Sequence, residues 1–429
     1  MKRKFTYLIL IVIFFSLTAF VIFKYNGKTK NEPLSVYPIK ERKGPAALLP
    51  EWASVQSSSN KLIRIVREKP DDVKSAIALA SLYLQEARIT GDFAYYNAAA
   101  LKYINNVLAQ QPQNFNALVL KSMIQLSQHH FAEALGTAGT AVKINPHNAF
   151  VYGLLVDGSV EMGKYDQAVA YSDKMMSIRP DIRSYARVAY LREIHGDLPG
   201  AIEAMTMAVE SGAYGEESTE WCRTQLAQLY EQTGQTKHAE MHYTIAQQYR
   251  PGYAFALSGL SRIAAVQKDY PKAIQLCEKA IEAGNDYSLK QQLAELYILS
   301  GNPKKADGIL RNLIAELIKD NEEETGTNHH AGMEVAQLYL LLNEPQKAIE
   351  YAQKEFNNRP DNIDVNETLA WVYFKAGKTD KAVTHMQTAL KTGKKNPGFL
   401  YKAGLIYAKA GDTATAKELV AKSMNVECY

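Results

Sequence analysis

The chain has 429 residues, of which 47% are hydrophobic and 22% are charged, and this composition excludes wholesale disorder. Its three cysteines, Cys222, Cys277 and Cys428, are too far apart in the sequence for a disulfide framework or a CxxC zinc site. Residues 1–50 hold nine Lys and Arg against two Asp and Glu, so the rest of the chain carries a net charge of −3. Because that body is mildly acidic, the sequence favours a protein or peptide partner over nucleic acid.

The N-terminal segment has the features of a membrane signal. Residues 1–4 form a basic flank, and residues 5–23 are uncharged and rich in Ile, Leu, Phe and Val. A helix over that run would be about 28 Å long, which matches the hydrocarbon thickness of a bilayer. Two interpretations stay open, a retained transmembrane anchor and a cleaved secretory signal. We expect the retained anchor, since the apolar run exceeds a usual signal core and no small-x-small cleavage pattern follows it.

Residues 24–50 are predicted to form a basic tether. The segment is polar, has no helical or strand period, and is punctuated by Pro33, Pro38, Pro45 and Pro50. Prolines keep such a linker extended, so it can hold the following domain away from a bilayer. Basic residues flank the apolar run on both sides and separate the two membrane orientations only weakly. We expect a single-pass protein with its soluble body on the extracytoplasmic (periplasmic) side.

Beyond the tether, residues 51–69 are predicted to form a half-repeat helix that caps a stack of repeats over residues 70–429. Three apolar residues of this helix, Leu62, Ile65 and Val66, share one face. In the stack, a small residue is followed three positions later by Tyr in six places: Ala80/Tyr83, Ala227/Tyr230, Ala294/Tyr297, Ala336/Tyr339, Ala370/Tyr373 and Gly404/Tyr407. A Gly or Asn turn and then an alanine follow at fixed distances, as in Gly234/Ala239, Asn343/Ala348 and Gly377/Ala382.

This pattern resembles the tetratricopeptide repeat (TPR), a helix–turn–helix unit of about 34 residues. Ten copies can be aligned, with first helices predicted to start near Val73, Phe115, Ala149, Ile182, Glu220, Ala254, Tyr287, His329, Ile363 and Pro397. The resemblance implies an all-α fold, a right-handed α-solenoid of about ten units preceded by one transmembrane helix. It also implies that each repeat contacts only its neighbours, and that the turn glycines take positive φ.

In this architecture the first helices line the concave face, and positions 2, 5, 9 and 12 of each copy point inward. Aromatic and Arg residues at such positions are typical anchors of recognition surfaces. We therefore predict a partner site made by Arg183, Tyr190, Trp221, Gln228, Phe255, Arg262, Trp371 and Phe374. A segment with apolar anchors and an acidic residue would suit that stripe. The alternative is that the side chains at positions 9 and 12 pack between adjacent first helices.

Motifs of catalysis are absent from the sequence, which has no HExxH, no GxxxxGK[ST] and no GxSxG. The anchor and the repeats occupy almost the whole chain, so we expect no enzymatic activity, no catalytic residues, no cofactor and no small-molecule substrate. The two histidine pairs, His129-His130 and His329-His330, have no Cys, Asp or Glu nearby at ligand spacing. We expect them to be polar surface, with no metal site.

The sequence thus predicts a membrane-tethered TPR scaffold that binds a protein or peptide on its concave face, in the assembly of an envelope or membrane complex. Two alternatives stay open. The chain could be an accessory or regulatory subunit of a separate enzyme, or a secreted TPR protein whose signal peptide is cleaved.

Overall fold

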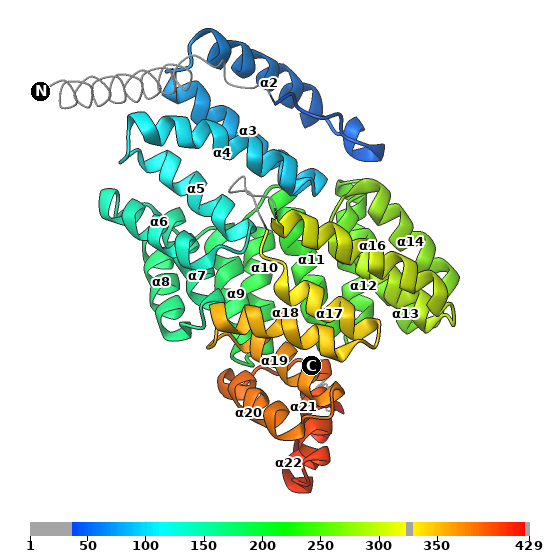
Figure 1. Ribbon diagram of the computed structural model, residues 1–429. Helices are drawn as coiled ribbons and strands as arrows, with labels where there is room; N and C mark the ends of the chain where they lie inside the picture. Colours follow the sequence, from blue (N-terminus) through cyan, green and yellow to red (C-terminus); the bar gives the residue numbers. More distant parts are fainter. Residues whose placement is uncertain (1–36, 323–328, 425–429) are drawn as a thin grey trace, which may run out of the picture.

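The structure, a computed structural model, describes residues 37–322 and 329–424 (Figure 1). The predicted basic flank (1–4), the predicted anchor (5–23) and the first part of the predicted tether lie outside the described residues. Among the residues that are described, none of the helices combines the length and the apolar character needed to cross a bilayer.

The described chain consists of 21 α-helices and two short 3-10 helices, and it contains no strand. The N-terminal part holds η1 (Gly44–Leu48) and α2 (Glu51–Glu68), and η2 (Leu390–Thr392) follows α20. Ten helix pairs follow α2, and we number them as repeats 1 to 10: α3 (Val73–Thr90) with α4 (Phe93–Gln110), α5 (Phe115–Ser127) with α6 (Phe131–Ile144), α7 (Ala149–Glu161) with α8 (Tyr165–Ile178), α9 (Ile182–Ile194) with α10 (Leu198–Glu210), α11 (Glu217–Gln232) with α12 (Thr236–Tyr249), α13 (Ala254–Val266) with α14 (Tyr270–Ala283), α15 (Tyr287–Leu299) with α16 (Pro303–Glu322), α17 (Gly332–Leu341) with α18 (Pro345–Asn358), α19 (Ile363–Lys375) with α20 (Thr379–Ala389), and α21 (Pro397–Lys409) with α22 (Thr413–Met424).

Local capping explains where the first helices start. Seven of the ten follow an Asp or Asn whose side chain accepts a hydrogen bond from a backbone N–H of the first turn. Eight first helices begin at the predicted residue. The other two, α11 and α17, begin three residues away from their predicted starts, Glu220 and His329, and neither has a side-chain cap.

The recurring small residues form the core between the paired helices. The alanines at the eighth and twentieth positions, among them Ala80, Ala227, Ala239, Ala370 and Ala382, have no exposed surface. Because an alanine occupies little space, the two helices of a repeat approach closely and bury their larger neighbours. All ten turns between paired helices carry one residue at positive φ, which is Gly in seven repeats, so the predicted left-handed turn is confirmed.

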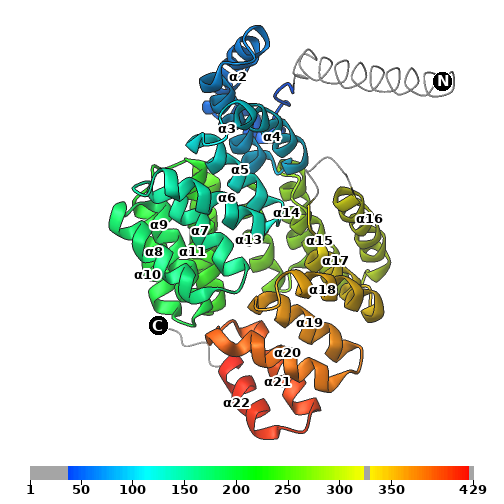
Figure 2. The ribbon, with the colours of Figure 1, turned by 60° about the vertical axis from the view of Figure 1, so that its left-hand side comes forward.

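The stack curves back on itself after six repeats, as Figures 1 and 2 show. We call the line where successive superhelical turns meet the seam, and we name its junctions by the repeats that they join. In each junction the turn inside one repeat meets the loop that precedes a repeat six positions further on. The paired residues are Thr90 with Asn285 (junction 1/7), Gln128 with His330 (2/8), Glu161 with Asn362 (3/9) and Gly196 with Gly393 (4/10).

Each junction rests on close contact. The backbone N–H groups of Asn285 and His330 donate to the carbonyl oxygens of Thr90 and Gln128 at 3.0 and 3.1 Å. At junction 4/10 a Cβ built on Gly196 would lie 2.3 Å from the Gly393 carbonyl oxygen. The expectation that each repeat contacts only its neighbours is therefore wrong. The small rotation between repeats accumulates until the chain meets itself, which sequence periodicity alone does not reveal.

Junction 3/9 is the most completely paired part of the seam. The buried Arg359 guanidinium donates to Glu161 across the seam and to Glu355 at 2.6 Å, and it lies 4.6 Å from the centre of the Phe131 ring. The Asn362 amide donates to the Glu161 carbonyl oxygen at 3.0 Å, and the Ile363 N–H donates to the Tyr165 hydroxyl at 2.9 Å. Two regions 200 residues apart are thus held by charge-assisted and neutral hydrogen bonds together.

Candidate functional site

The inner face of the superhelix is made by the first helices. Adjacent first helices contact one another along the stack, as α5 does with α7 and α17 does with α19. Four of them, α11, α13, α15 and α17, form an open groove of about 520 Å³ across repeats 5 to 8. We call it the concave groove, and it is lined by Glu231, Arg262, Ala265, Val266, Tyr287, Ser288, Gln291, Gln292, Glu295, Leu296, Leu299, Met333, Glu334 and Gln337.

One end of the concave groove is polar and already paired. Arg262 bonds to Glu231 of the preceding repeat at 2.8 Å and donates to the Tyr243 hydroxyl at 2.7 Å. Burial alone would lower the pKa of Arg262. The hydrogen bonds that Arg262 donates to Glu231 and Tyr243, together with the negative charge of Glu231, raise this pKa instead. The arginine therefore holds repeat 5 to repeat 6, and its charge is neutralised before any partner arrives.

A second part of the groove, at the C-terminal end of α13 and of α15, is apolar and exposed. Val266 is 71% exposed and Leu299 is 60% exposed, and both stand at the last turn of their first helices. Glu295 lies beside them, accepts a hydrogen bond from Gln291 at 3.0 Å, and forms no salt bridge with any residue that the structure describes. This end of the groove thus offers apolar contact area next to an uncompensated negative charge.

A family model described as tetratricopeptide repeat matches residues 224–288 and 367–422, which include α13, α21 and most of α11 and α19. The chain therefore contains tetratricopeptide repeats, which the family model places in repeats 5–6 and 9–10. Among solved structures, it is similar to a human IFIT1 dimer with PPP-AAAA, at 13% identity and a TM-score of 0.46, over 88% of this chain and 95% of that one. It is also similar to an APC/C hetero-tetramer Cut9-Hcn1, at 12% identity and a TM-score of 0.38, over 91% and 76%. No curated protein sequence matches the chain.

All eight residues predicted for the partner site of this TPR protein lie on first helices, but the structure does not gather them into one site. Only Arg262 lines the concave groove. Trp221 and Phe255 are half-buried against the cores of repeats 4–5 and 5–6, and Gln228 is half-buried as well. Trp371 and Phe374 stack on each other with ring centres 5.0 Å apart. The alternative weighed above, packing between repeats, thus describes these aromatic residues.

The two predicted residues on α9 lie nearer the solvent. Arg183 is exposed, and its guanidinium lies 5.1 Å from the centre of the Phe150 ring. Tyr190 is 36% exposed, yet desolvation by the surrounding protein, with Asp364 and Glu161, raises its pKa well above the ordinary value. Tyr190 of repeat 4 therefore lies close to carboxylates of repeats 3 and 9, on both superhelical turns.

Charged groups from both superhelical turns gather near Tyr190. Lys394 donates to Asp364 at 2.8 Å and lies 3.7 Å from Glu367. Burial raises the pKa of Glu161 to about 7, and burial also raises the pKa of Glu193, although Gln232 donates a hydrogen bond to it. A carboxylate ionises less readily where water is scarce, so these shifts mark a poorly hydrated interior.

The sequence reasoning missed the exposed apolar end of the groove. Val266 and Leu299 occupy the thirteenth position of their repeats, which was not among the positions taken to point inward. The signal available in the sequence was the apolar side chain at this position, at the end of the first helix. Repeats 5 and 9 carry the polar residues Gln232 and Lys375 at the same position.

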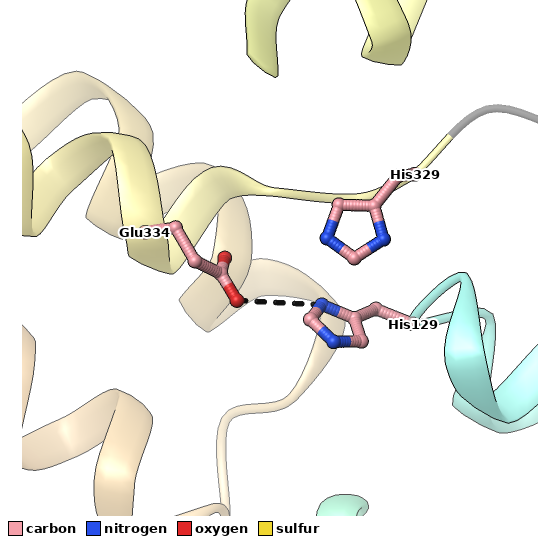
Figure 3. Close-up of side chains that lie close together, drawn as sticks. All are labelled: His129, His329 and Glu334. Atoms are coloured by element: carbon pink, nitrogen blue, oxygen red, sulfur yellow. Dashed lines mark ion pairs between the residues drawn. The ribbon is translucent and has the colours of Figure 1, made fainter. Parts of the chain in front are cut away.

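A second cluster was missed at junction 2/8, shown in Figure 3. The histidine pairs expected to be separate surface features meet across the seam, with ring centres 4.2 Å apart for His129 and His329 and 4.1 Å apart for His130 and His330. Glu334 of α17 points toward both His129 and His329. Its Oε1 lies 3.6 Å from His129 Nδ1 and accepts a hydrogen bond from the Tyr287 hydroxyl at 3.2 Å.

The seam cluster places imidazole rings beside the buried carboxylate of Glu334. Burial and the neighbouring His329 lower the pKa of His129 to about 3, so its ring is uncharged at neutral pH. His129 Nδ1 also lies 3.1 Å from the His330 carbonyl oxygen. The two histidine pairs are 200 residues apart in the sequence, so the spacing within either pair alone did not indicate a metal site.

Proposed function

We propose that this TPR protein is a membrane-tethered scaffold whose concave groove binds an extended or helical segment of a partner protein. The observation that carries the proposal is the exposed apolar end of the groove, where Val266 and Leu299 stand beside Glu295. Exposed apolar side chains that lie together in a groove, unlike ones scattered singly over a surface, mark binding sites.

The charges of the groove define the segment that fits it. Because Arg262 is already paired with Glu231, it does not offer the groove a free cation. The negative charge of Glu295 is the one left without an ion pair among the described residues of the groove end. The fitting segment therefore carries an apolar side chain for the Val266–Leu299 strip and a basic residue for Glu295.

Residues 5–23 supply the membrane part of the proposal, as a retained anchor that leaves the TPR body in the extracytoplasmic space. The competing interpretation, a secreted protein with a cleaved signal, differs in the N-terminus of the mature chain. A mature N-terminus between residues 18 and 30 would exclude the anchor.

Site-specific crosslinking tests the groove. A photoreactive residue in place of Val266 in the full-length chain, in its own membranes, should capture one defined partner. Val169 on the second helix α8 is the matched control, since it is also an exposed valine, at 39%. We expect capture at position 266 and not at position 169, and Glu295→Lys should lower the yield about tenfold, the effect of losing about 1.4 kcal/mol.

The outcome also separates the alternatives. Equal capture at both positions would place the partner surface outside the groove. If the captured partner is an enzyme whose activity falls when the TPR chain is removed, the chain is an accessory subunit. Crosslinks that disappear after ribonuclease treatment would overturn our expectation that no nucleic acid is bound.

A further inference from the structure

The seam cluster contains polar atoms that the protein itself leaves without partners. Glu334 Oε2 and His329 Nε2 are buried and have no hydrogen-bond partner, and the Glu334 side chain is only 8% exposed. Buried polar atoms are almost always paired, because an unpaired one loses its hydration without compensation. Two buried polar groups without partners, on side chains whose ligand atoms lie within 4.8 Å of one another, indicate a place for a bound ion.

The donor set and its geometry identify the class of ligand. His129, His329 and Glu334 each offer one atom, and the three atoms all lie within 4.8 Å of one another. The distance of 3.6 Å between His129 Nδ1 and Glu334 Oε1 is close to the separation of about 3.3 Å between two ligands of tetrahedral zinc. Two imidazoles with one carboxylate suit Zn²⁺ and similar transition metals, whereas Mg²⁺ and Ca²⁺ require oxygen ligands.

We propose that His129, His329 and Glu334 bind a divalent transition-metal ion of the Zn²⁺ class at junction 2/8 of the seam. His129 gives up its contact with the His330 carbonyl oxygen and turns its Nδ1 lone pair to the metal, while His329 contributes Nε2 and Glu334 contributes a carboxylate oxygen. The Tyr287 hydroxyl, which donates to Glu334, orients that carboxylate from the second shell.

The metal joins two superhelical turns that are otherwise far apart in the chain. His129 sits in the turn of repeat 2, and His329 and Glu334 sit at the start of repeat 8. His129 and His329 also border a cavity of about 780 Å³ between repeats 1, 2 and 7, through which solvent can supply a fourth ligand. Binding therefore ties the seam at a point that the protein's own hydrogen bonds leave incomplete, and it does so next to the concave groove, which Glu334 and Tyr287 also line.

Direct metal binding tests the proposal. The full-length chain, purified in detergent and stripped with a chelator, is titrated with Zn²⁺ by calorimetry and with Co²⁺ by visible absorption, which reports four-coordinate geometry. We expect one equivalent of tight binding and a rise in the thermal midpoint. His329→Ala and Glu334→Gln should each weaken Zn²⁺ binding by at least about 100-fold, since even second-shell changes cost 10- to 100-fold.

Two controls keep the test decisive. His147→Ala removes an exposed histidine far from the seam, and His330→Ala removes the neighbouring ring but keeps the backbone carbonyl. Both should bind Zn²⁺ like the wild type, and circular dichroism of all variants without metal should be the same. Absence of one-equivalent binding in the wild type would overturn the proposal. So would binding that survives both His329→Ala and Glu334→Gln, or that is lost equally in His330→Ala.

Discussion

Junctions 3/9 and 2/8 occupy equivalent places on the seam, one repeat apart, yet they differ in how completely their buried polar atoms are hydrogen-bonded. At junction 3/9 Arg359 donates hydrogen bonds to carboxylates on both sides of the seam. The Asn362 amide donates one to the Glu161 carbonyl oxygen across the seam. At junction 2/8 one backbone hydrogen bond, the contact of His129 Nδ1 with the His330 carbonyl oxygen and the histidine rings join the two turns, but buried atoms of His329 and Glu334 stay unpaired. The comparison indicates that the protein's own side chains pair the buried polar groups of junction 3/9, whereas junction 2/8 leaves buried polar atoms that a ligand can pair.

Removing the arginine should break the complete junction most severely. Arg359→Ala leaves Glu161 and Glu355 without their shared cation, and its side chain is 4% exposed. Breaking a buried ion pair on one side costs about 3–5 kcal/mol. Urea denaturation should show that loss in unfolding free energy. The exposed Arg311, which pairs with Asp307 and Glu344, is the control, and Arg311→Ala should leave the unfolding curve unchanged. Equal curves for the two variants would mean that the seam contributes nothing.

A matched pair of glycines sharpens the comparison between seam and open turn. Gly163 at junction 3/9 and Gly377 in repeat 9 both have positive φ. A Cβ at Gly163 would lie 2.4 Å from the Asp361 backbone, whereas one at Gly377 meets nothing within 4 Å. Gly377→Ala should therefore cost only the left-handed strain, about 1–2 kcal/mol.

Gly163→Ala adds overpacking of the seam, for a total of about 2–5 kcal/mol. Hydrogen exchange in this variant should rise both in repeat 3 and in repeat 9. Faster exchange confined to repeat 3 would contradict the seam as a cooperative contact.

Glu161 gives junction 3/9 a pH dependence of its own. Burial raises its pKa to about 7 from the ordinary 4.5, so between these values the folded chain keeps a proton that the unfolded chain has lost. The stability that this proton contributes is full below pH 4.5 and is lost as pH rises through about 7. The unfolding free energy of the wild type, relative to Glu161→Gln, should therefore fall between about pH 5 and about pH 8. A difference that does not change with pH would show that Glu161 is ionised throughout.

The sequence predicted the repeats well, because each depends on local chemistry. The small residues at positions eight and twenty, the Asp and Asn caps and the left-handed turns act within 34 residues, and helix starts such as Ala149 and Ile363 follow from them. The seam depends on the rotation between repeats, summed over six of them, and no single residue encodes it. For the same reason His129 and His329 looked like unrelated surface residues. The eight residues predicted for the partner site do not come together in one place, because aromatic side chains at inward positions serve packing as readily as recognition.

Because repeats six positions apart contact each other, the structure also limits where whole repeats can be inserted into the chain or deleted from it. In an open stack, a repeat can be gained or lost in the middle with only its two neighbours to repack. Here the loss of one repeat between the third and the ninth would shift every later loop by one place. The turn that carries Gly163 would then face the loop before α21, and Arg359 would no longer reach Glu161. Insertions and deletions of whole repeats are thus compatible with this superhelix only at its two ends.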